Sequence, residues 1–286
     1  MKVLVTGKNG QLGFDVIERL RAFNIECLGT DRNQLDITDE VQVDHVISTF
    51  KPDVVIHCAA YTAVDRAEQE KELCFQVNVL GTKYIAQACK KNDAKLLYVS
   101  TDYVFDGTGE APFQESDETN PINFYGETKN LGEIEIQKLM ENYFIVRVSW
   151  VFGSNGNNFV KTMLRLSSER EELSVVADQI GSPSYTVDLA KLFHTIIQTE
   201  AYGIYHATND GFCSWYEFAC EIFEAAKITI KVNPILSKDF VTLAKRPYNS
   251  RLSKEKLNTL NIPKLPNWKE ALSDYIAILS NAGKSS

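Results

Sequence analysis

The sequence predicts an α/β protein built on a doubly wound parallel sheet, with a smaller, mostly helical C-terminal lobe. Over the first 150 residues, short strand-like runs alternate with helical patterns. The strand-like runs are continuously apolar, which is typical of parallel strands covered on both faces. A glycine-rich loop follows the first run and leads into the first helix. Right-handed crossovers between such strands then place helices on both sides of the sheet.

The individual elements follow from these patterns in chain order. Predicted strands lie at 2–6, 25–30, 53–57, 95–100 and 143–149. Predicted helices lie at 11–23, 38–50 with Thr38 as N-cap, 64–91 and 127–140, and later at 158–168, 187–199, 215–227 and 268–279. We therefore expect a dinucleotide-binding domain at 1–150. Residues 151–286 should form mainly a substrate-binding lobe, with some segments returning to the sheet.

Composition excludes several classes of protein. The 286 residues carry a formal net charge of −8, which argues against a general nucleic-acid binder. The longest apolar runs are far too short to cross a bilayer, and the first residues lack the apolar segment of a signal peptide. The six cysteines show no C-x-x-C spacing, so we expect reduced thiols in a cytoplasmic protein and no metal site.

The first glycine loop predicts a dinucleotide site. Gly7, Gly10 and Gly13, with Gln11 and Leu12 between the last two, form G-x-x-G-x-x-G directly after the first strand. Glycine allows a sharp turn, close approach of backbone amides to a pyrophosphate, and tight packing of helix on sheet. The helix N-terminus then presents free N–H groups and a positive dipole end to the anion.

Residues after the second and third strands extend this predicted site. Asp31 can accept hydrogen bonds from a ribose 2′-hydroxyl, whereas Arg32 can meet a 2′-phosphate, so the choice between NADH and NADPH stays open. Asp36 and Ile37 should lie near the adenine. The small residues that follow the third strand, Ala59 and Ala60 before Tyr61, let the cofactor pass close to the backbone.

A tyrosine and a lysine predict the chemistry. Tyr125 and Lys129 are four residues apart at the start of a helix, so both side chains share one face. A neighbouring ammonium favours phenolate and should lower the pKa of the tyrosine from about 10. Thr101 ends the fourth strand, where its hydroxyl can donate to a substrate carbonyl oxygen while Tyr125 supplies a proton.

Together these motifs resemble those of the extended short-chain dehydrogenases/reductases. More narrowly, the stretches at 59–65, 100–107, 150–153, 157–159, 178–183 and 246–252 are similar to the dTDP-4-dehydrorhamnose reductase family. The resemblance implies Thr101, Tyr125 and Lys129 as catalytic residues and adds Thr62 to the cofactor contacts. Tyr125 and Lys129 are also expected to contact the cofactor, where the Lys129 amine can hold the nicotinamide ribose. It implies that Asp102, Tyr103, Trp150, Arg246 and Asn249 bind the nucleotide-sugar substrate. It also suggests a homodimer and allows for Mg²⁺, for which the sequence offers no ligand cluster.

The resemblance implies NAD(P)H-dependent reduction of the C4 ketone of dTDP-4-dehydro-β-L-rhamnose to dTDP-L-rhamnose, for surface polysaccharide. An epimerase or 4,6-dehydratase of the same superfamily is an alternative. Dehydratases typically place Asp-Glu after the threonine, and here Asp102-Tyr103 follows, which counts against dehydration but not against epimerisation. A binding protein such as the regulatory β subunit of methionine adenosyltransferase is another alternative. The intact Thr101, Tyr125 and Lys129 give no hint of lost catalysis.

Overall fold

The computed structural model describes residues 1–260, 262 and 264–282. Its centre is a six-stranded parallel sheet with the order β10-β5-β4-β3-β1-β2. The strands are β1 (Lys2–Thr6), β2 (Glu26–Thr30), β3 (Val54–His57), β4 (Lys95–Thr101), β5 (Tyr143–Val148) and β10 (Gly203–His206). The chain leaves β1 for β2 on one side and returns to β3 on the other. This reversal confirms the doubly wound fold and opens a crevice at the carboxyl ends of β1 and β3.

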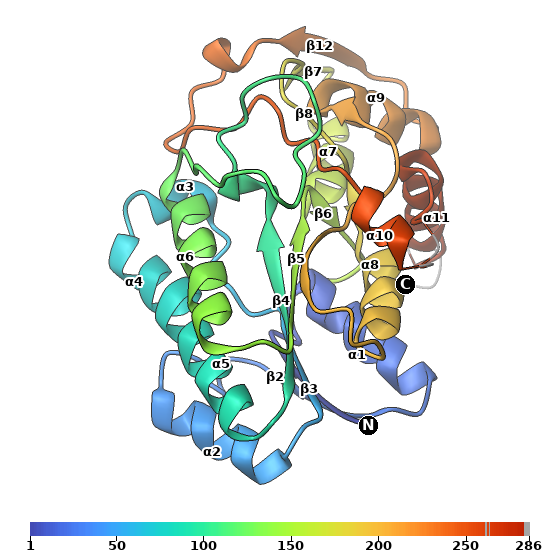
Figure 1. The fold of residues 1–286 in the computed structure, drawn as a ribbon. Helices are drawn as coiled ribbons and strands as arrows, with labels where there is room; N and C mark the ends of the chain where they lie inside the picture. The colour runs from blue at the N-terminus through green and yellow to red at the C-terminus, as the bar shows by residue number, and fades with distance from the viewer. Residues whose placement is uncertain (261, 263, 283–286) are drawn as a thin grey trace.

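Helices cover both faces of the sheet (Figure 1). One layer contains α1 (Gln11–Ala22) and α8 (Thr186–Ile196), and the other contains α2 (Glu40–Phe50), α5 (Thr82–Lys91) and α6 (Phe124–Leu139). Successive strand residues point to opposite faces, so Val3 and Val5 pack with the first layer and Leu4 with the second. Burial on both faces explains why the strands are continuously apolar in sequence.

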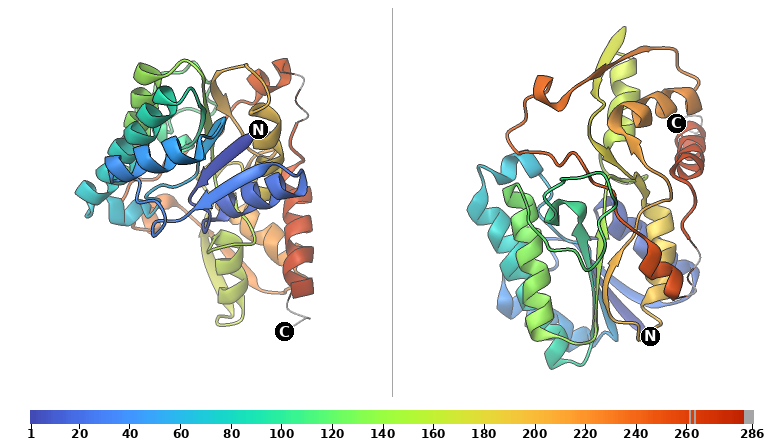
Figure 2. Two further views of the ribbon diagram at one scale, coloured as in Figure 1. Left: turned by 90° about the horizontal axis from the view of Figure 1, so that it is seen from below. Right: turned by 45° about the horizontal axis from the view of Figure 1, so that its top comes forward.

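The second half of the chain builds a lobe at the carboxyl ends of the strands, seen at the top of Figure 1 and turned forward in Figure 2. Its helices are α7 (Phe159–Ser167), α9 (Trp215–Ala225) and α11 (Trp268–Ala282), with the 3₁₀ turn η3 (Ser237–Asp239). Its short strands are β6 (Val151–Phe152), β7 (Glu172–Val176), β8 (Ile180–Gly181), β9 (Ser184–Tyr185), β11 (Cys213–Ser214) and β12 (Lys231–Ile235). A separate core around Phe152, Phe218 and Tyr275 holds the lobe together. By contrast, α8, β10 and the short helix α10 (Glu255–Thr259), whose Leu257 packs into the core beside the sheet, belong with the central sheet.

The long helical segment expected at 64–91 is broken at 68–70 and contains a π-helical turn. The segment contains α3 (Val64–Ala67), α4 (Lys71–Phe75), a π-helix η1 (Gln76–Gly81) and then α5. The π-helix carries Asn78, whose side chain accepts from the Tyr61 N–H at 2.8 Å and donates to the Tyr61 carbonyl at 3.1 Å. It also donates to the Thr128 hydroxyl at 3.1 Å. The wider turn thus ties the loop after β3 to α6, a contact that apolar periodicity cannot reveal.

Two helix starts also differ from expectation. The N-cap of α2 is Asp39 rather than Thr38, because the Asp39 side chain accepts from the Gln42 N–H at 3.0 Å. The Thr38 hydroxyl donates instead to Asp36 at 2.7 Å. Helix α6 begins at Phe124 rather than at 127, with Asn123 accepting from the Gly126 N–H at 2.8 Å. The earlier start places Tyr125 in the first turn of α6.

Candidate active site

The loop between β1 and α1 is shaped for the close approach of a bound group. Gly7 has a φ of +75°, and a Cβ atom there would lie 2.8 Å from the Ala59 nitrogen. Gly10 is the N-cap residue of α1 and brings no side chain to its first turn. Gln11, Leu12 and Gly13 line the same cavity as these two glycines. A bare helix N-terminus beside such a turn fits a dinucleotide pyrophosphate.

The end of β2 presents both an acid and a base to this cavity. Asp31 accepts from Asn9 Nδ2 at 3.1 Å and from the Asn33 N–H at 3.0 Å, and it pairs with Lys8 at 3.4 Å. The Arg32 side chain is 75% exposed and pairs loosely with Asp36 at 3.6 Å. Arg32 therefore retains freedom to meet a phosphate, while Asp31 remains available to a ribose hydroxyl.

The remaining predicted cofactor residues lie on the walls of the same cavity. They are Asp36, Ile37, Ala59, Ala60, Tyr61 and Thr62. The Ala59 N–H donates to the Thr6 hydroxyl at 3.2 Å, which fixes the loop after β3 against the end of β1. The backbone of Tyr61 is held by Asn78, and its hydroxyl donates to Glu70 at 2.7 Å. The site is thus fixed by hydrogen bonds between segments far apart in sequence.

The structure brings Thr101, Tyr125 and Lys129 together on one cavity wall. Thr101 ends β4, and Tyr125 and Lys129 project from the first two turns of α6. The Thr101 side chain lies next to the Tyr125 side chain, and the Thr101 hydroxyl donates to Asp102 at 3.0 Å. A hydroxyl, a phenol and an amine therefore converge where a carbonyl group could bind.

The pKa of Tyr125 differs from the sequence expectation. Burial raises the pKa of this phenol well above its ordinary value, and the nearby Asp102 carboxylate raises it further. The neighbouring Thr101 side chain lowers it, but not enough to compensate. The expected lowering by Lys129 is therefore wrong for the protein alone, and the phenol is kept protonated, as a proton donor must be.

Lys129 is a buried amine, only 2% exposed. Its Nζ donates to the Val99 carbonyl at 2.7 Å and lies 4.0 Å from the centre of the Tyr98 ring. Burial lowers the pKa of Lys129 to about 7. The Glu133 carboxylate raises this pKa and is the strongest of the groups that do so. The amine therefore changes charge near neutral pH.

Asp102 and Tyr103 follow Thr101 in the 3₁₀ turn η2 (Asp102–Val104) and line the cavity. Burial raises the pKa of Asp102 to about 6, although the side chains of Ser250 and Thr101 act to lower it. Its Oδ2 atom is buried and makes no hydrogen bond of good geometry. The Tyr103 ring meets Tyr125 edge to face with centroids 5.8 Å apart. An unpartnered buried carboxylate oxygen beside the phenol fits a sugar hydroxyl.

Trp150 lines the cavity together with a neighbour that the sequence analysis did not identify, Trp215. Its ring stacks on Trp215 with centroids 3.6 Å apart, and both rings line the cavity. Trp150 has a φ of +49°, a strained value for a non-glycine residue. Trp215 opens α9 after the N-cap Ser214. That capping signal was readable in the sequence, but the stacking of residues 65 positions apart was not.

Two predicted substrate residues do not line the cavity among the described residues. Arg246 pairs with Asp65 at 2.6 Å and donates to the Tyr103 hydroxyl at 3.4 Å, so it stands behind Tyr103. Asn249 is buried and donates to the carbonyls of Ala111 at 2.8 Å and Thr108 at 3.3 Å. The structure thus places Arg246 one layer from the cavity and uses Asn249 to hold a loop.

The cavity has a volume of about 1150 Å³, above the upper end of about 1000 Å³ for a site that holds one drug-sized ligand. Its size therefore fits a dinucleotide and a second ligand together.

Within the described part of the chain, no group of three or more His, Cys, Asp or Glu side chains could hold a metal ion. None of the described helices is long and apolar enough to span a membrane.

Comparison with known proteins agrees with this geometry. The model of the RmlD substrate binding domain family matches residues 1–281. dTDP-4-dehydrorhamnose reductase of Aggregatibacter actinomycetemcomitans is 42% identical over 96% of this chain and 98% of its own. The spore coat polysaccharide biosynthesis protein SpsK of Bacillus subtilis is 38% identical over 98% and 99%. The crystal structure of dTDP-4-dehydrorhamnose reductase from Bacillus anthracis in complex with NADP has a TM-score of 0.94 and 44% identity, covering 96% and 98%.

The doubly wound sheet, the glycine loop and the Thr101, Tyr125 and Lys129 side chains define an NAD(P)H-dependent oxidoreductase of the extended short-chain dehydrogenase/reductase class. Within this class, the chain belongs to the dTDP-4-dehydrorhamnose reductase family.

Proposed function

We propose that the chain reduces the C4 ketone of dTDP-4-dehydro-β-L-rhamnose to dTDP-L-rhamnose, a precursor of surface polysaccharide. The observation that carries this proposal is the meeting of Thr101, Tyr125 and Lys129 in a single cavity that the glycine loop and Trp150 also line. The named activity of the Aggregatibacter relative and the NADP bound to the Bacillus anthracis relative support it.

The side chains divide the chemistry between them. When bound, NADPH or NADH supplies the hydride to the ketone carbon. Thr101 donates a hydrogen bond to the carbonyl oxygen, where negative charge develops. Tyr125, held protonated by burial, donates the proton to that oxygen. Lys129, when charged, stabilises the phenolate that Tyr125 leaves.

The two parts of the chain have different tasks in this proposal. Residues 1–150 hold the dinucleotide through the glycine loop and Asp31 or Arg32. Residues 151–286 mainly hold the nucleotide sugar, with Trp150 at the border between the two parts. Asp102 and Tyr103 contact the sugar, and Arg246 steadies Tyr103 from behind. Asn249 acts indirectly, because its amide holds the loop at 108–111.

A homodimer and a cytoplasmic location remain predictions. The resemblance to the family supports the dimer, and light scattering after gel filtration measures it directly. All six cysteines are free thiols, which suits a reducing compartment.

The test is to mix the purified chain with dTDP-4-dehydro-β-L-rhamnose and follow NADPH and NADH absorbance separately. The proposal expects one cofactor oxidised for each ketone reduced, and dTDP-L-rhamnose as product. An isomeric sugar formed without net cofactor consumption would instead show an epimerase. Absence of any turnover, with cofactor binding intact, would favour a binding protein.

A further inference from the structure

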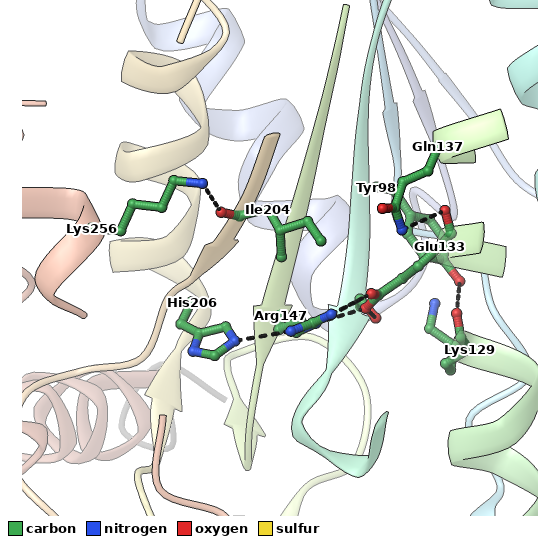
Figure 3. A network of polar contacts seen from close by, with 9 residues as sticks. Tyr98, Lys129, Glu133, Gln137, Arg147, Ile204, His206 and Lys256 are labelled. Carbon is green, nitrogen blue, oxygen red and sulfur yellow. Dashed lines mark hydrogen bonds and ion pairs between the residues drawn. The ribbon is translucent and has the colours of Figure 1, made fainter. Parts of the chain in front are cut away.

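A buried polar network lies behind the catalytic residues (Figure 3). Glu133 on α6 and Arg147 on β5 are 1% and 2% exposed. They form a forked pair, with Nε to Oε1 at 2.9 Å and Nη2 to Oε2 at 2.6 Å. The Ser100 hydroxyl donates to Glu133 Oε1 at 2.5 Å, and Arg147 Nη1 lies 3.3 Å from His206 Nε2. The proposed reaction uses none of these four side chains directly.

The strand register explains how the network reaches across the sheet. Arg147 is paired in register with Ser100 of β4 on one side and with His206 of β10 on the other. The three side chains therefore form a row across three adjacent strands. Glu133 descends onto this row from α6 and bonds to two of its members. The network thus fastens α6 to the end of β4, directly before Thr101.

The same glutamate lies one helical turn beyond Lys129, so the two residues share a face of α6. The Lys129 amine donates to the neutral Val99 carbonyl and lies over the Tyr98 ring. The Tyr98 hydroxyl donates in turn to the backbone carbonyl of Lys129 at 3.4 Å. A charged amine in this environment is stabilised by a carboxylate whose position is fixed. The forked bond to Arg147 fixes the Glu133 carboxylate one helical turn from Lys129.

We propose that Glu133 is a positioning residue for the reaction: clamped by Arg147 and Ser100, it seats α6 against β4 and keeps the amine of Lys129, which shares a face of α6 with Tyr125, cationic. This inference rests on the proposed function, because it assigns Glu133 a part in the same proton transfer. Glu133 does not line the cavity and acts only through Lys129. Arg147 supports it by fixing the orientation of its carboxylate.

Other ionisable groups face Lys129 from the elements around it, and they set the background for any pH profile. They are His57 and Cys58 at the end of β3, Cys74 on α4, Tyr98 on β4, and Arg147 behind Glu133, while Tyr125 and Asp102 line the same cavity as Lys129. Burial lowers the pKa of His57 to about 3, and the Lys129 charge lowers it further, so His57 is neutral. Burial raises the pKa of the Cys58 thiol to about 12, so it is neutral as well. Of the groups that raise the pKa of Lys129, Glu133 has the largest effect.

The experiment compares pH profiles of kcat/KM for the keto sugar at saturating NADPH. The double variant Glu133→Gln/Arg147→Met removes both charges and leaves neither one buried alone. Glu133→Asp keeps the charge but withdraws it by one methylene. Glu135→Gln is the matched control, because it removes the same charge two residues along α6, where Glu135 pairs with Lys138.

The loss of rate at high pH reports the deprotonation of Lys129. We expect this limb of the profile to move to lower pH by about one unit in the double variant. In Glu133→Asp it should lie between its positions in the wild type and the double variant. In Glu135→Gln it should stay at the wild-type position. Limbs that coincide in all four proteins, with only a lower Tm, would overturn the inference and leave Glu133 a purely structural role. If the double variant does not fold, the high-pH limb of Glu133→Asp, compared with that of the wild type, tests the inference by itself. An inactive wild-type protein would contradict the proposed function instead.

Discussion

At the scale of single residues, burial shifts the pKa values of two side chains that the proposed reaction uses. Burial keeps Tyr125 protonated and brings the pKa of Lys129 to about 7. The raised pKa of Tyr125 keeps its proton available for donation. The lowered pKa of Lys129 reduces the fraction of charged amine that can stabilise the resulting phenolate. Perturbed groups that meet in one cavity are typical of catalytic sites.

The phenol itself gives the first prediction. We expect Tyr125→Phe to lower kcat by about 10²- to 10⁴-fold, because it removes the proton donor and keeps the shape of the ring. The Kd for NADPH, measured by fluorescence titration, should stay within about twofold, a difference of under 1 kcal/mol. Tyr84→Phe, outside the cavity lining, is the control. Near-normal turnover in Tyr125→Phe would remove this residue from the mechanism.

Arg32 gives the second prediction, which concerns cofactor choice. Its guanidinium is mostly exposed and only loosely paired, so a 2′-phosphate can recruit it. We expect Arg32→Ala to raise KM for NADPH by about tenfold, as expected for a lost charged hydrogen bond, and to change KM for NADH little. Arg21→Ala removes a similar exposed arginine from α1 and should affect neither. Equal changes for both cofactors would show that Arg32 does not read the phosphate.

At the scale of elements, local signals predicted the glycine loop, the strand ends and the helix that carries Tyr125 and Lys129. They failed between 64 and 91, where apolar periodicity suggested one continuous helix. There, the position of the chain is set by side chains that bond across the fold, such as Asn78 to Tyr61 and Thr128. Such contacts leave no spacing in the sequence, since their partners are 17 and 50 residues away.

The π-helix yields a prediction at this scale. Asn78 is 1% exposed and satisfies both backbone polar groups of Tyr61. We expect Asn78→Ala to lower the free energy of unfolding by about 1–3 kcal/mol, because it leaves buried polar groups unpaired, and to weaken NADPH binding by displacing the loop after β3. Urea unfolding and cofactor titration measure the two effects. Gln76→Ala, which loses only a bond to Glu72 on the surface, should do neither.

At the scale of the whole molecule, the doubly wound sheet and its two helical layers followed from the sequence, because burial on both faces is visible in β1, β3, β4 and β5. The meeting of distant segments did not. Trp215 of α9 stacks on Trp150, which lies between β5 and β6, and Arg147 of β5 pairs with Glu133 of α6. Each pair joins segments that are far apart in sequence, so no local motif predicts either contact.

The buried amine also makes the stability of the whole chain depend on pH. The pKa of Lys129 is about 7 in the folded protein against an ordinary value of 10.5, so the unfolded chain binds the extra proton between these values. Stability from this group therefore rises with pH across that window, and below pH 7 the penalty of the buried charge is complete. The shift corresponds to at most about 4 to 5 kcal/mol.

Lys129→Met removes this penalty while filling nearly the same volume. We expect the variant to unfold at a higher urea concentration than the wild type at pH 6, with the advantage shrinking steadily as the pH rises from about 7 towards 10. The same variant should lose turnover, because nothing then stabilises the Tyr125 phenolate. Urea titrations at four or five pH values test the first expectation, and cofactor oxidation tests the second. A stability difference that does not change with pH would mean that the Lys129 amine keeps its ordinary pKa in the folded protein, so that its burial carries no electrostatic penalty.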